Sequence, residues 1–181
     1  MLKTIKEVLR VGDATVKYPF APIERPRDAR GKPEHDSVKC FACSACANAC
    51  PPNAIQTSLD LTAGTKSWSI NYGRCVFCGR CEEVCPVDAI RLSPEFELAV
   101  MKKEDLEEIC TYSLQRCSEC GEFFAPTKAV DYAKRVLAQS NTLNDDVSLA
   151  LDSINLCMSC KQKQDAHRYW EQSRRAGELL C

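Results

Sequence analysis

Cys40-Phe-Ala-Cys43-Ser-Ala-Cys46-Ala-Asn-Ala-Cys50-Pro51 is the first of two copies of one cysteine motif. The second copy reads Cys75-Val-Phe-Cys78-Gly-Arg-Cys81-Glu-Glu-Val-Cys85-Pro86. From Cys40 to Cys75, and from Cys50 to Cys85, the offset is 35 positions. Both copies are followed by an Ala-Ile pair, at residues 54–55 and 89–90. The chain therefore contains an internal repeat built on four cysteines.

The spacing C-x2-C-x2-C-x3-C-P is that of bacterial ferredoxins, in which three cysteines of one run bind one cluster and the fourth binds the other. Backbone N–H groups of such a tight loop point at the sulfurs and stabilise their negative charge. We therefore predict two 4Fe-4S clusters, cluster one held by Cys40, Cys43, Cys46 and Cys85, and cluster two by Cys75, Cys78, Cys81 and Cys50.

Two other uses of the cysteines are less consistent with the sequence. Fourteen cysteines in 181 residues approach the density of a disulfide scaffold, but that class is short and secreted. Met1-Leu-Lys-Thr-Ile-Lys lacks the apolar core of a signal peptide, so a reducing cytosol is expected. Structural zinc in these eight positions remains an alternative, because C-x2-C pairs also suit zinc.

A second metal motif follows in Cys117-Ser-Glu-Cys120-Gly121 and Cys157-Met-Ser-Cys160. Four thiolates suit zinc or a single rubredoxin-type iron, and with no open position the site is expected to be structural. The intervening residues 121–156 exceed the usual ribbon spacing, so unligated thiols or a further iron-sulfur cluster remain alternatives. Cys110 and Cys181 are expected to be free thiols, and the isolated His35 to be a surface residue.

The predicted fold class is α+β, with three parts. Residues 1–35 form an amphipathic helix and an extended arm, 36–100 a double 4Fe-4S ferredoxin domain, and 101–181 a helical region with the C-x2-C metal module. A β-hairpin inserted between the cysteine motifs is expected from the alternating segments 55–59 and 67–72. Helices are predicted over Lys102–Leu114, Thr127–Ala138 and Gln164–Leu180.

Charge and hydropathy restrict the partners. With 24 basic and 25 acidic residues the chain has no nucleic-acid signature, and no run of 18 apolar residues is present to cross a membrane. Residues 2–10 place Leu2, Ile5, Val8 and Leu9 on one helical face beside basic residues. That face suits an anionic membrane surface, a partner subunit or the protein's own domain. Four prolines between residues 15 and 33 exclude a helix there and predict a strap over a partner or over the core.

Residues around the motifs point to one family: Thr15-Val-Lys-Tyr-Pro19, Arg30-Gly-Lys32, Gly73-Arg74 before the second motif, and Pro94-Glu-Phe-Glu-Leu98. Together they resemble the 8Fe ferredoxin-like subunit of complex I. The cysteine pair around Cys117 and the arm Arg30-Gly-Lys-Pro33 make the chain more similar to the equivalent subunit of membrane-bound nickel-iron hydrogenases of the formate hydrogenlyase and hydrogenase-4 type.

The resemblance implies an electron-transfer subunit without catalytic residues. Its implied partners are the hydrogenase small and large subunits, a second ferredoxin-type iron-sulfur subunit on the formate dehydrogenase side, and membrane subunits. The implied location is cytoplasmic, peripheral on the inner face of the cell membrane. Two alternatives stay open: a true complex I subunit, and an assembly scaffold whose metal sites are structural.

Overall fold

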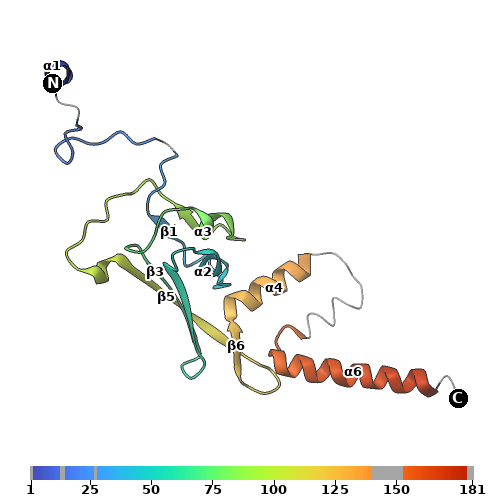
Figure 1. Cartoon of the computed structure of the whole chain (residues 1–181). Coiled ribbons are helices and arrows are strands. Elements are labelled where there is room, and N and C mark those ends of the chain that lie inside the picture. Colours follow the sequence, from blue (N-terminus) through green and yellow to red (C-terminus); the bar gives the residue numbers. More distant parts are fainter. Residues whose placement is uncertain (1, 13–14, 27, 140–152, 179–181) are drawn as a thin grey trace.

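The computed structural model describes residues 2–12, 15–26, 28–139 and 153–178, which form a mixture of helices and strands. In chain order the elements are α1 (Leu2–Val11), β1 (Pro33–His35), α2 (Ala45–Ala49), β2 (Ile55–Asp60), β3 (Thr65–Asn71), α3 (Arg80–Glu83), β4 (Ile90–Leu92), η1 (Lys103–Leu106), β5 (Glu107–Arg116), β6 (Phe123–Pro126), α4 (Thr127–Gln139) and α6 (Met158–Glu178). Figure 1 shows α1 at one end of an elongated molecule, α6 at the other, and the sheets between them.

The two cysteine motifs fold around a small core closed by a two-stranded sheet. In this sheet β1 and β4 are antiparallel, with His35 opposite Ile90. The short helices α2 and α3, one from each motif, pack against each other. Trp68 and Ile70 from β3 and Ile90 from β4 are almost fully buried. Burying each such side chain contributes about 1.5–3 kcal/mol, so a core of this size leaves room for a large stabilising contribution from metal centres.

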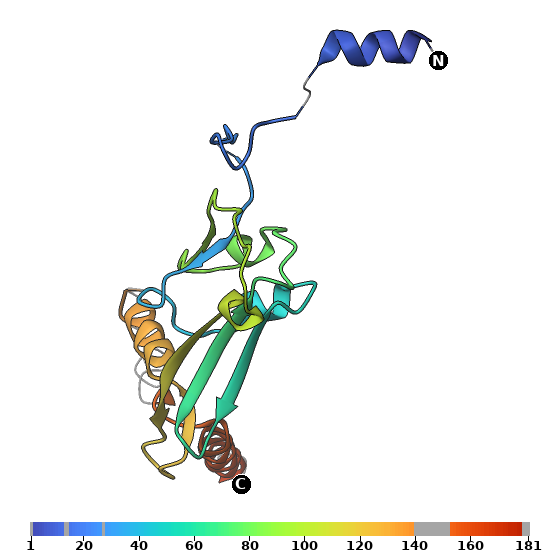
Figure 2. The same ribbon diagram turned by 90° about the vertical axis from the view of Figure 1, so that its left-hand side faces the viewer.

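A second, antiparallel sheet has the strand order β2-β3-β5-β6. Its strands β2 and β3 are the hairpin predicted between the motifs, which is confirmed, with Ile55 opposite Ile70. Figure 2 shows this sheet extending from the cysteine-containing core toward the carboxy-terminal helices. The sheet therefore connects the core to the region that carries the second metal motif.

The predicted helix Lys102–Leu114 is wrong beyond its first turn. Only η1 is helical, and Glu107–Arg116 form β5. Burial in β5 has a period of two, since Tyr112 and Leu114 are buried while Ile109 is 64% exposed. Seven residues of β5 pair with β3. This pairing outweighs the acidic residues near Glu104, which were interpreted as the start of a helix. The region 101–181 is thus helical only in its later part.

Two helical predictions in that later part are confirmed. The helix α4 covers the predicted segment Thr127–Ala138 and one residue more. The helix α6 begins at Met158, earlier than expected, and runs to Glu178. Cys181 and most of the linker between α4 and α6 lie outside the described residues.

The arm before β1 lies against the segment that follows β4. Tyr18 donates a hydrogen bond to Glu97 over 2.9 Å, and the Arg25 guanidinium bonds the carbonyl of Pro94. Gly31 donates its N–H to the Ser93 carbonyl over 2.8 Å, and a side chain at Gly31 would collide with the backbone there. The arm is therefore a strap on its own chain, fixed to residues 93–97 rather than laid over the buried core, and a partner beneath it stays a prediction.

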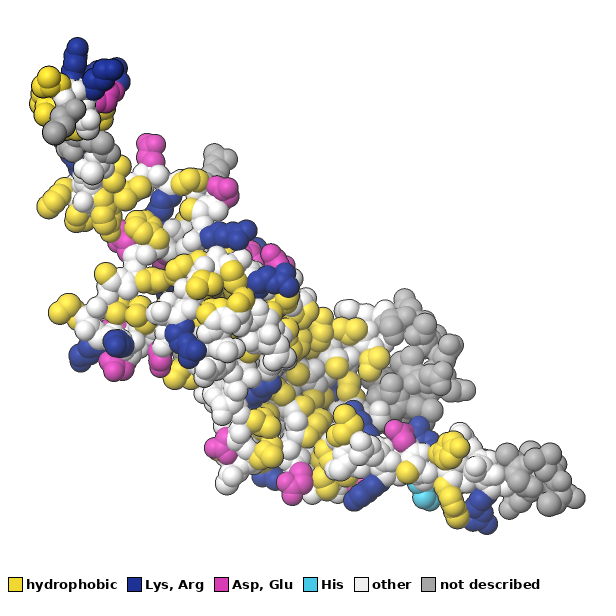
Figure 3. Space-filling view, viewed as in Figure 1, with side chains coloured by type: hydrophobic (Ala, Val, Ile, Leu, Met, Phe, Trp, Pro, Cys, Tyr) yellow, Lys and Arg dark blue, Asp and Glu magenta, His cyan; other side chains and the backbone are white. Residues whose placement is uncertain are grey.

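Helix α1 stands clear of the rest of the described chain (Figure 2) and has no buried residue. Leu2, Val8 and Leu9 are 84%, 64% and 79% exposed. Figure 3 shows apolar side chains on one side of α1 and basic ones on the other. Helix α1 therefore does not pack on the protein's own domain, which was one of the three roles considered from the sequence. Among the described helices, none combines the length and the apolar character needed to cross a bilayer.

Candidate iron-sulfur and metal centres

The repeat is visible in the backbone conformation of the two cysteine loops. Three pairs of residues, each pair 35 positions apart, have positive φ angles: Ala42 (58°) and Phe77 (53°), Ser44 (68°) and Gly79 (83°), and Asn53 (51°) and Asp88 (51°). Residues other than glycine rarely adopt this conformation, and such strain costs about 1–3 kcal/mol per residue. The same strain at equivalent positions indicates that the loops are shaped for a common ligand.

These loops direct backbone N–H groups at the sulfurs of the first and fourth cysteine of each motif. The N···Sγ distances are 3.4 Å from Ala42 to Cys40, 3.4 Å from Phe77 to Cys75, 3.3 Å from Ala54 to Cys50 and 3.1 Å from Ala89 to Cys85. Such bonds stabilise thiolate charge and help to set the reduction potential of an iron-sulfur cluster. The arrangement is nearly symmetric between the two halves.

One cavity collects the cysteines predicted to hold cluster two. It is lined by Cys50, Cys75, Cys78 and Cys81, together with the apolar groups of Pro33, Pro52, Ile55, Val76, Phe77 and Leu92. Cys50 belongs to the first motif and the other three cysteines to the second, which is the crossed set expected for a two-cluster ferredoxin. Four thiols around an apolar cavity fit a 4Fe-4S cluster and support the predicted ligand exchange.

The other half of the core differs by one hydrogen bond. Trp68 donates its indole N–H to the sulfur of Cys46, a predicted ligand of cluster one, over 3.4 Å. The chain has only one other tryptophan, Trp170, which lies in α6 and is 55% exposed. Cluster one would therefore receive a side-chain N–H···S bond that cluster two does not receive from a tryptophan.

Replacing Trp68 by phenylalanine should lower the reduction potential of cluster one, because a hydrogen bond to the ligand sulfur stabilises the reduced cluster. The ring would still fill the core, so the iron content and the potential of cluster two should not change. Potentiometric titration followed by electron paramagnetic resonance measures both clusters, with Trp170→Phe as the control. Equal potentials in the variant and the parent protein would contradict this role of Trp68.

Burial influences the protonation of the predicted cluster ligands. It raises the pKa of the Cys81 thiol to about 11, and it also raises the pKa of Cys46 and of Cys75. These thiols are therefore protonated at neutral pH when no metal is bound. Because iron binds the thiolate, cluster insertion must release protons and is coupled to folding.

The four cysteines of the second metal motif meet as predicted from the sequence. The sulfurs of Cys117, Cys120, Cys157 and Cys160 all lie within 4.8 Å of one another, and those of Cys120 and Cys157 are 3.6 Å apart. With zinc–sulfur bonds of about 2.3 Å, the edge of a tetrahedral S4 site is about 3.8 Å. The set fits one tetrahedral ion. Cys117 and Cys120 come from the turn between β5 and β6, whereas Cys160 lies in the first turn of α6.

Hydrogen bonds lower the pKa of two of the four thiols in this site, Cys117 and Cys157, whereas the pKa of Cys120 and of Cys160 is raised. N–H groups of Cys120 and Cys157 lower the pKa of the Cys117 thiol to about 6, and Cys157 N lies 3.3 Å from that sulfur. The hydroxyl of Ser159 lies 3.0 Å from the Cys157 sulfur and is the main cause of that thiol's lowered pKa. Gly121 has a φ of +74°, which supports the tight turn after Cys120.

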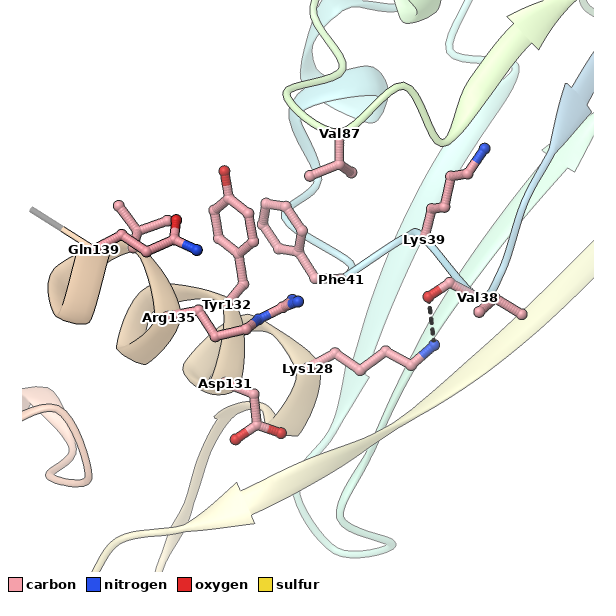
Figure 4. A pocket seen from close by; sticks show the side chains of 10 residues that line it. Val38, Lys39, Phe41, Val87, Lys128, Asp131, Tyr132, Arg135 and Gln139 are labelled. Carbon is pink, nitrogen blue, oxygen red and sulfur yellow. Dashed lines mark hydrogen bonds between the residues drawn. The ribbon is translucent and has the colours of Figure 1, made fainter.

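A groove runs between α4 and the loops that are predicted to hold cluster one (Figure 4). Phe41, next to Cys40, stacks on Tyr132 of α4 with ring centroids 4.5 Å apart. Val87, two residues after Cys85, lines the same groove. Lys128 of α4 donates a hydrogen bond to the Val38 carbonyl over 3.2 Å. Helix α4 is therefore fixed against the loop predicted to bind cluster one.

Sequence reasoning missed a second cluster of polar side chains. His35 is half-buried rather than on the open surface, and its ring stacks on Trp68 with centroids 3.8 Å apart. Its Nδ1 lies 3.6 Å from the sulfur of Cys110, which was expected to be a free thiol. The alternation of Glu108, Cys110 and Tyr112 would have indicated a shared face, but only after this segment had been recognised as a strand.

Paired four-cysteine loops, with Cys50 of the first facing the cysteines of the second, define a class: this is a dicluster iron-sulfur protein of the ferredoxin type. Residues 39–89 match the family described as 4Fe-4S dicluster domain. The prediction of iron-sulfur clusters is thereby confirmed.

The chain as a whole identifies a narrower family. Over 164 residues it is 44% identical to formate hydrogenlyase subunit 6 of Escherichia coli (strain K12), covering 91% of this chain and 90% of that protein. At this identity and coverage the chain belongs to the formate hydrogenlyase subunit 6 family, as the resemblance in the sequence indicated. A chain of the membrane-bound sulfane sulfur reductase, an archaeal respiratory membrane complex, is also similar, with 29% identity, 59% coverage of each chain and a TM-score of 0.43.

Proposed function

We propose that this protein relays electrons between a formate dehydrogenase-side ferredoxin subunit and the nickel-iron hydrogenase module of a membrane-associated complex. The observation that carries the proposal is the pair of cysteine loops, repeated with the same backbone conformation inside a chain that matches formate hydrogenlyase subunit 6 over nearly its whole length. The two clusters, once bound, supply one-electron redox chemistry. The chain's own contribution is to hold them, to exclude water and to direct N–H groups at their ligands.

The partners follow from the same proposal. They are the hydrogenase small and large subunits, a second ferredoxin-type iron-sulfur subunit and membrane subunits of the complex. The location is the cytoplasmic face of the membrane, where the exposed amphipathic helix α1 can bind lipid or a membrane subunit. In Figure 1, α1 lies on the side of α3, whereas α4 and α6 lie on the side of α2. The molecule therefore offers two separate ends to different partners.

The second metal motif is proposed to be structural. Four cysteines leave no open coordination position, so zinc or a single iron would link the β5–β6 turn to α6 without taking part in chemistry. This ion is the cofactor of the zinc-ribbon or rubredoxin-like module that is expected from the sequence. It is distinct from the electron path.

The groove beside α4 is proposed to receive an acidic segment of the second iron-sulfur subunit. It borders the Cys40 and Cys85 loops, so a partner bound there would approach cluster one closely. Its charged lining is mainly cationic, with Lys39, Lys128 and Arg135 against one carboxylate, Asp131. The charge of Lys39 is partly compensated by Asp36, whose carboxylate lies 3.4 Å from the Lys39 ammonium. Arg135 is exposed and lies over the Tyr132 ring. A basic rim of this kind favours acidic partners.

Anaerobic affinity purification from gently solubilised membranes tests the proposed function. Recovery of a nickel-iron large subunit together with formate-dependent hydrogen evolution is the expected result. Recovery of NADH-binding subunits without hydrogen would overturn the proposal in favour of complex I. Recovery of this chain alone would also overturn it.

A charge reversal in the same purification tests the groove. Arg135→Glu should reduce recovery of the second iron-sulfur subunit by about tenfold, equivalent to about 1.4 kcal/mol, while the hydrogenase subunits remain bound. Lys134→Glu makes the same charge change on the neighbouring residue of α4, which does not line the groove, and should have little effect. Equal losses in the two variants would argue against docking at this groove.

A further inference from the structure

Three potential metal ligands of different chemistry meet outside both predicted centres. They are His35 from β1 and Glu108 and Cys110 from β5, and their ligand atoms all lie within 4.8 Å of one another. All three residues are partly buried. Glu108 and Cys110 are two positions apart in a strand, so they share a face, and that face is turned toward His35.

The separations suit a tetrahedral ion. The distance from His35 Nδ1 to Cys110 Sγ is 3.6 Å. With zinc–nitrogen and zinc–sulfur bonds of about 2.0–2.1 Å and 2.3 Å, the nitrogen–sulfur edge of a zinc tetrahedron is about 3.6 Å. A small rotation of the Glu108 carboxylate would complete a three-ligand face. The fourth position would be open to water.

The side chains around these ligands hold them in place. The second nitrogen of His35, Nε2, lies 3.5 Å from the hydroxyl of Tyr112, and the ring is stacked on Trp68. Metal-binding histidines almost always have such a partner on the nitrogen that does not bind the ion. Tyr72 donates a 2.6 Å hydrogen bond to one oxygen of Glu108, which orients the carboxylate.

The position of the three residues gives such an ion a structural consequence. His35 belongs to the two-stranded sheet β1–β4, whereas Glu108 and Cys110 belong to the four-stranded sheet. An ion bound by all three would join the two sheets beside the core. A surface pocket reaches His35 from solvent, and it is lined by Glu34, Asp36 and Asp88 together with Lys39 and Arg91, which pair with Asp36 and Asp88.

We propose that His35, Glu108 and Cys110 form a third metal centre, which binds a borderline divalent cation such as Zn²⁺. One nitrogen, one carboxylate oxygen and one thiolate sulfur are all ligands that zinc accepts, and three protein ligands with one open position are a common zinc arrangement. The centre shares no ligand with the predicted iron-sulfur clusters or with the four-cysteine site, although Trp68 contacts both His35 and Cys46. It gives Cys110 a role that the cysteine motifs do not assign.

Metal analysis of the full chain tests this proposal. The protein is purified anaerobically with its clusters, equilibrated with micromolar Zn²⁺, desalted and analysed for zinc and iron per chain. His35→Gln and Glu108→Gln should each lower zinc by about one ion per chain and leave iron unchanged. The fall by one is expected whether the four-cysteine site holds zinc or iron. Glu107→Gln is the matched control, because Glu107 is the neighbouring carboxylate on the exposed face of β5.

Zinc K-edge X-ray absorption provides a second readout. In both variants the spectrum should lose the contribution of nitrogen and oxygen ligands. Unchanged iron shows that the variants are folded, so a fall in zinc cannot be assigned to general unfolding. Equal zinc contents in the variants, the control and the parent protein would overturn the proposal and leave His35 and Cys110 as a hydrogen-bonded pair. Neither readout measures electron transfer, so failure here is distinguishable from failure of the proposed function.

Discussion

Replacing Cys50 by serine is expected to remove cluster two rather than cluster one, although Cys50 lies in the motif that is predicted to supply three ligands of cluster one. The physical reason is the cavity in which Cys50 faces Cys75, Cys78 and Cys81. A serine hydroxyl is a much poorer iron ligand than a thiolate, so the cluster with three remaining cysteines should be lost or severely weakened. Iron should fall by about half, and hydrogen production in the complex should fall to background because the electron path is interrupted.

Two reference variants make this test specific. Cys78→Ser removes a central cysteine of the second motif, which is predicted to bind cluster two, and Cys43→Ser removes its counterpart in the first motif, which is predicted to bind cluster one. The electron paramagnetic resonance spectrum and the remaining potential of Cys50→Ser should match those of Cys78→Ser. A match to Cys43→Ser would show that each motif binds its own cluster and that the ligands are not exchanged.

The sequence could predict the cluster-binding loops because their chemistry depends on local spacing. Four cysteines with a following proline specify the loop, and the offset of 35 residues is repeated in the φ angles of Ala42 and Phe77. The S4 site was also predictable, since C-x2-C pairs restrict which sulfurs can meet. Its long linker did not prevent Cys157 from meeting Cys120. For the cluster-binding loops and for the S4 site, the spacing of cysteines along the chain was therefore enough for the prediction.

Features that depend on distant pairing could not be predicted in this way. The segment after Lys102 was read as a helix from its acidic start, and only its pairing with β3 makes it a strand. The same error hid the shared face of Glu108, Cys110 and Tyr112. The bond from Trp68 to Cys46 also joins residues 22 positions apart on different elements. No local pattern in the sequence indicates such a contact.

Removing the metal from the four-cysteine site should release α6 from the rest of the protein. Beyond its first turn the described side chains of α6 are mostly exposed, and the apolar cluster at its start consists of Leu156, three cysteines and the neighbouring Phe124. Burial of Leu156 contributes about 1.5–3 kcal/mol. Structural zinc in zinc-finger peptides contributes about 10–16 kcal/mol, so the metal should dominate. Most of the stability of a helix in a protein comes from tertiary packing rather than from intrinsic propensity, and α6 has little packing beyond its first turn.

Hydrogen exchange on the full chain measures this release. In Cys160→Ser, amides of residues 158–178 should exchange at least about a hundredfold faster than in the parent protein. A hundredfold change requires the free energy of opening the helix to fall by only about 2.7 kcal/mol. Met158→Ala changes a 70% exposed side chain at the start of the same helix and should leave exchange nearly unchanged. The electron paramagnetic resonance signals of the two 4Fe-4S clusters should stay at the parent level, whether the four-cysteine site holds zinc or iron, because Cys160 is not among the predicted cluster ligands. If α6 kept its protection without the metal, the site would not be what holds this helix. If the 4Fe-4S signals also fell, the two metal regions would fold as one unit, and the assembly-scaffold interpretation of the distal module would lose its basis.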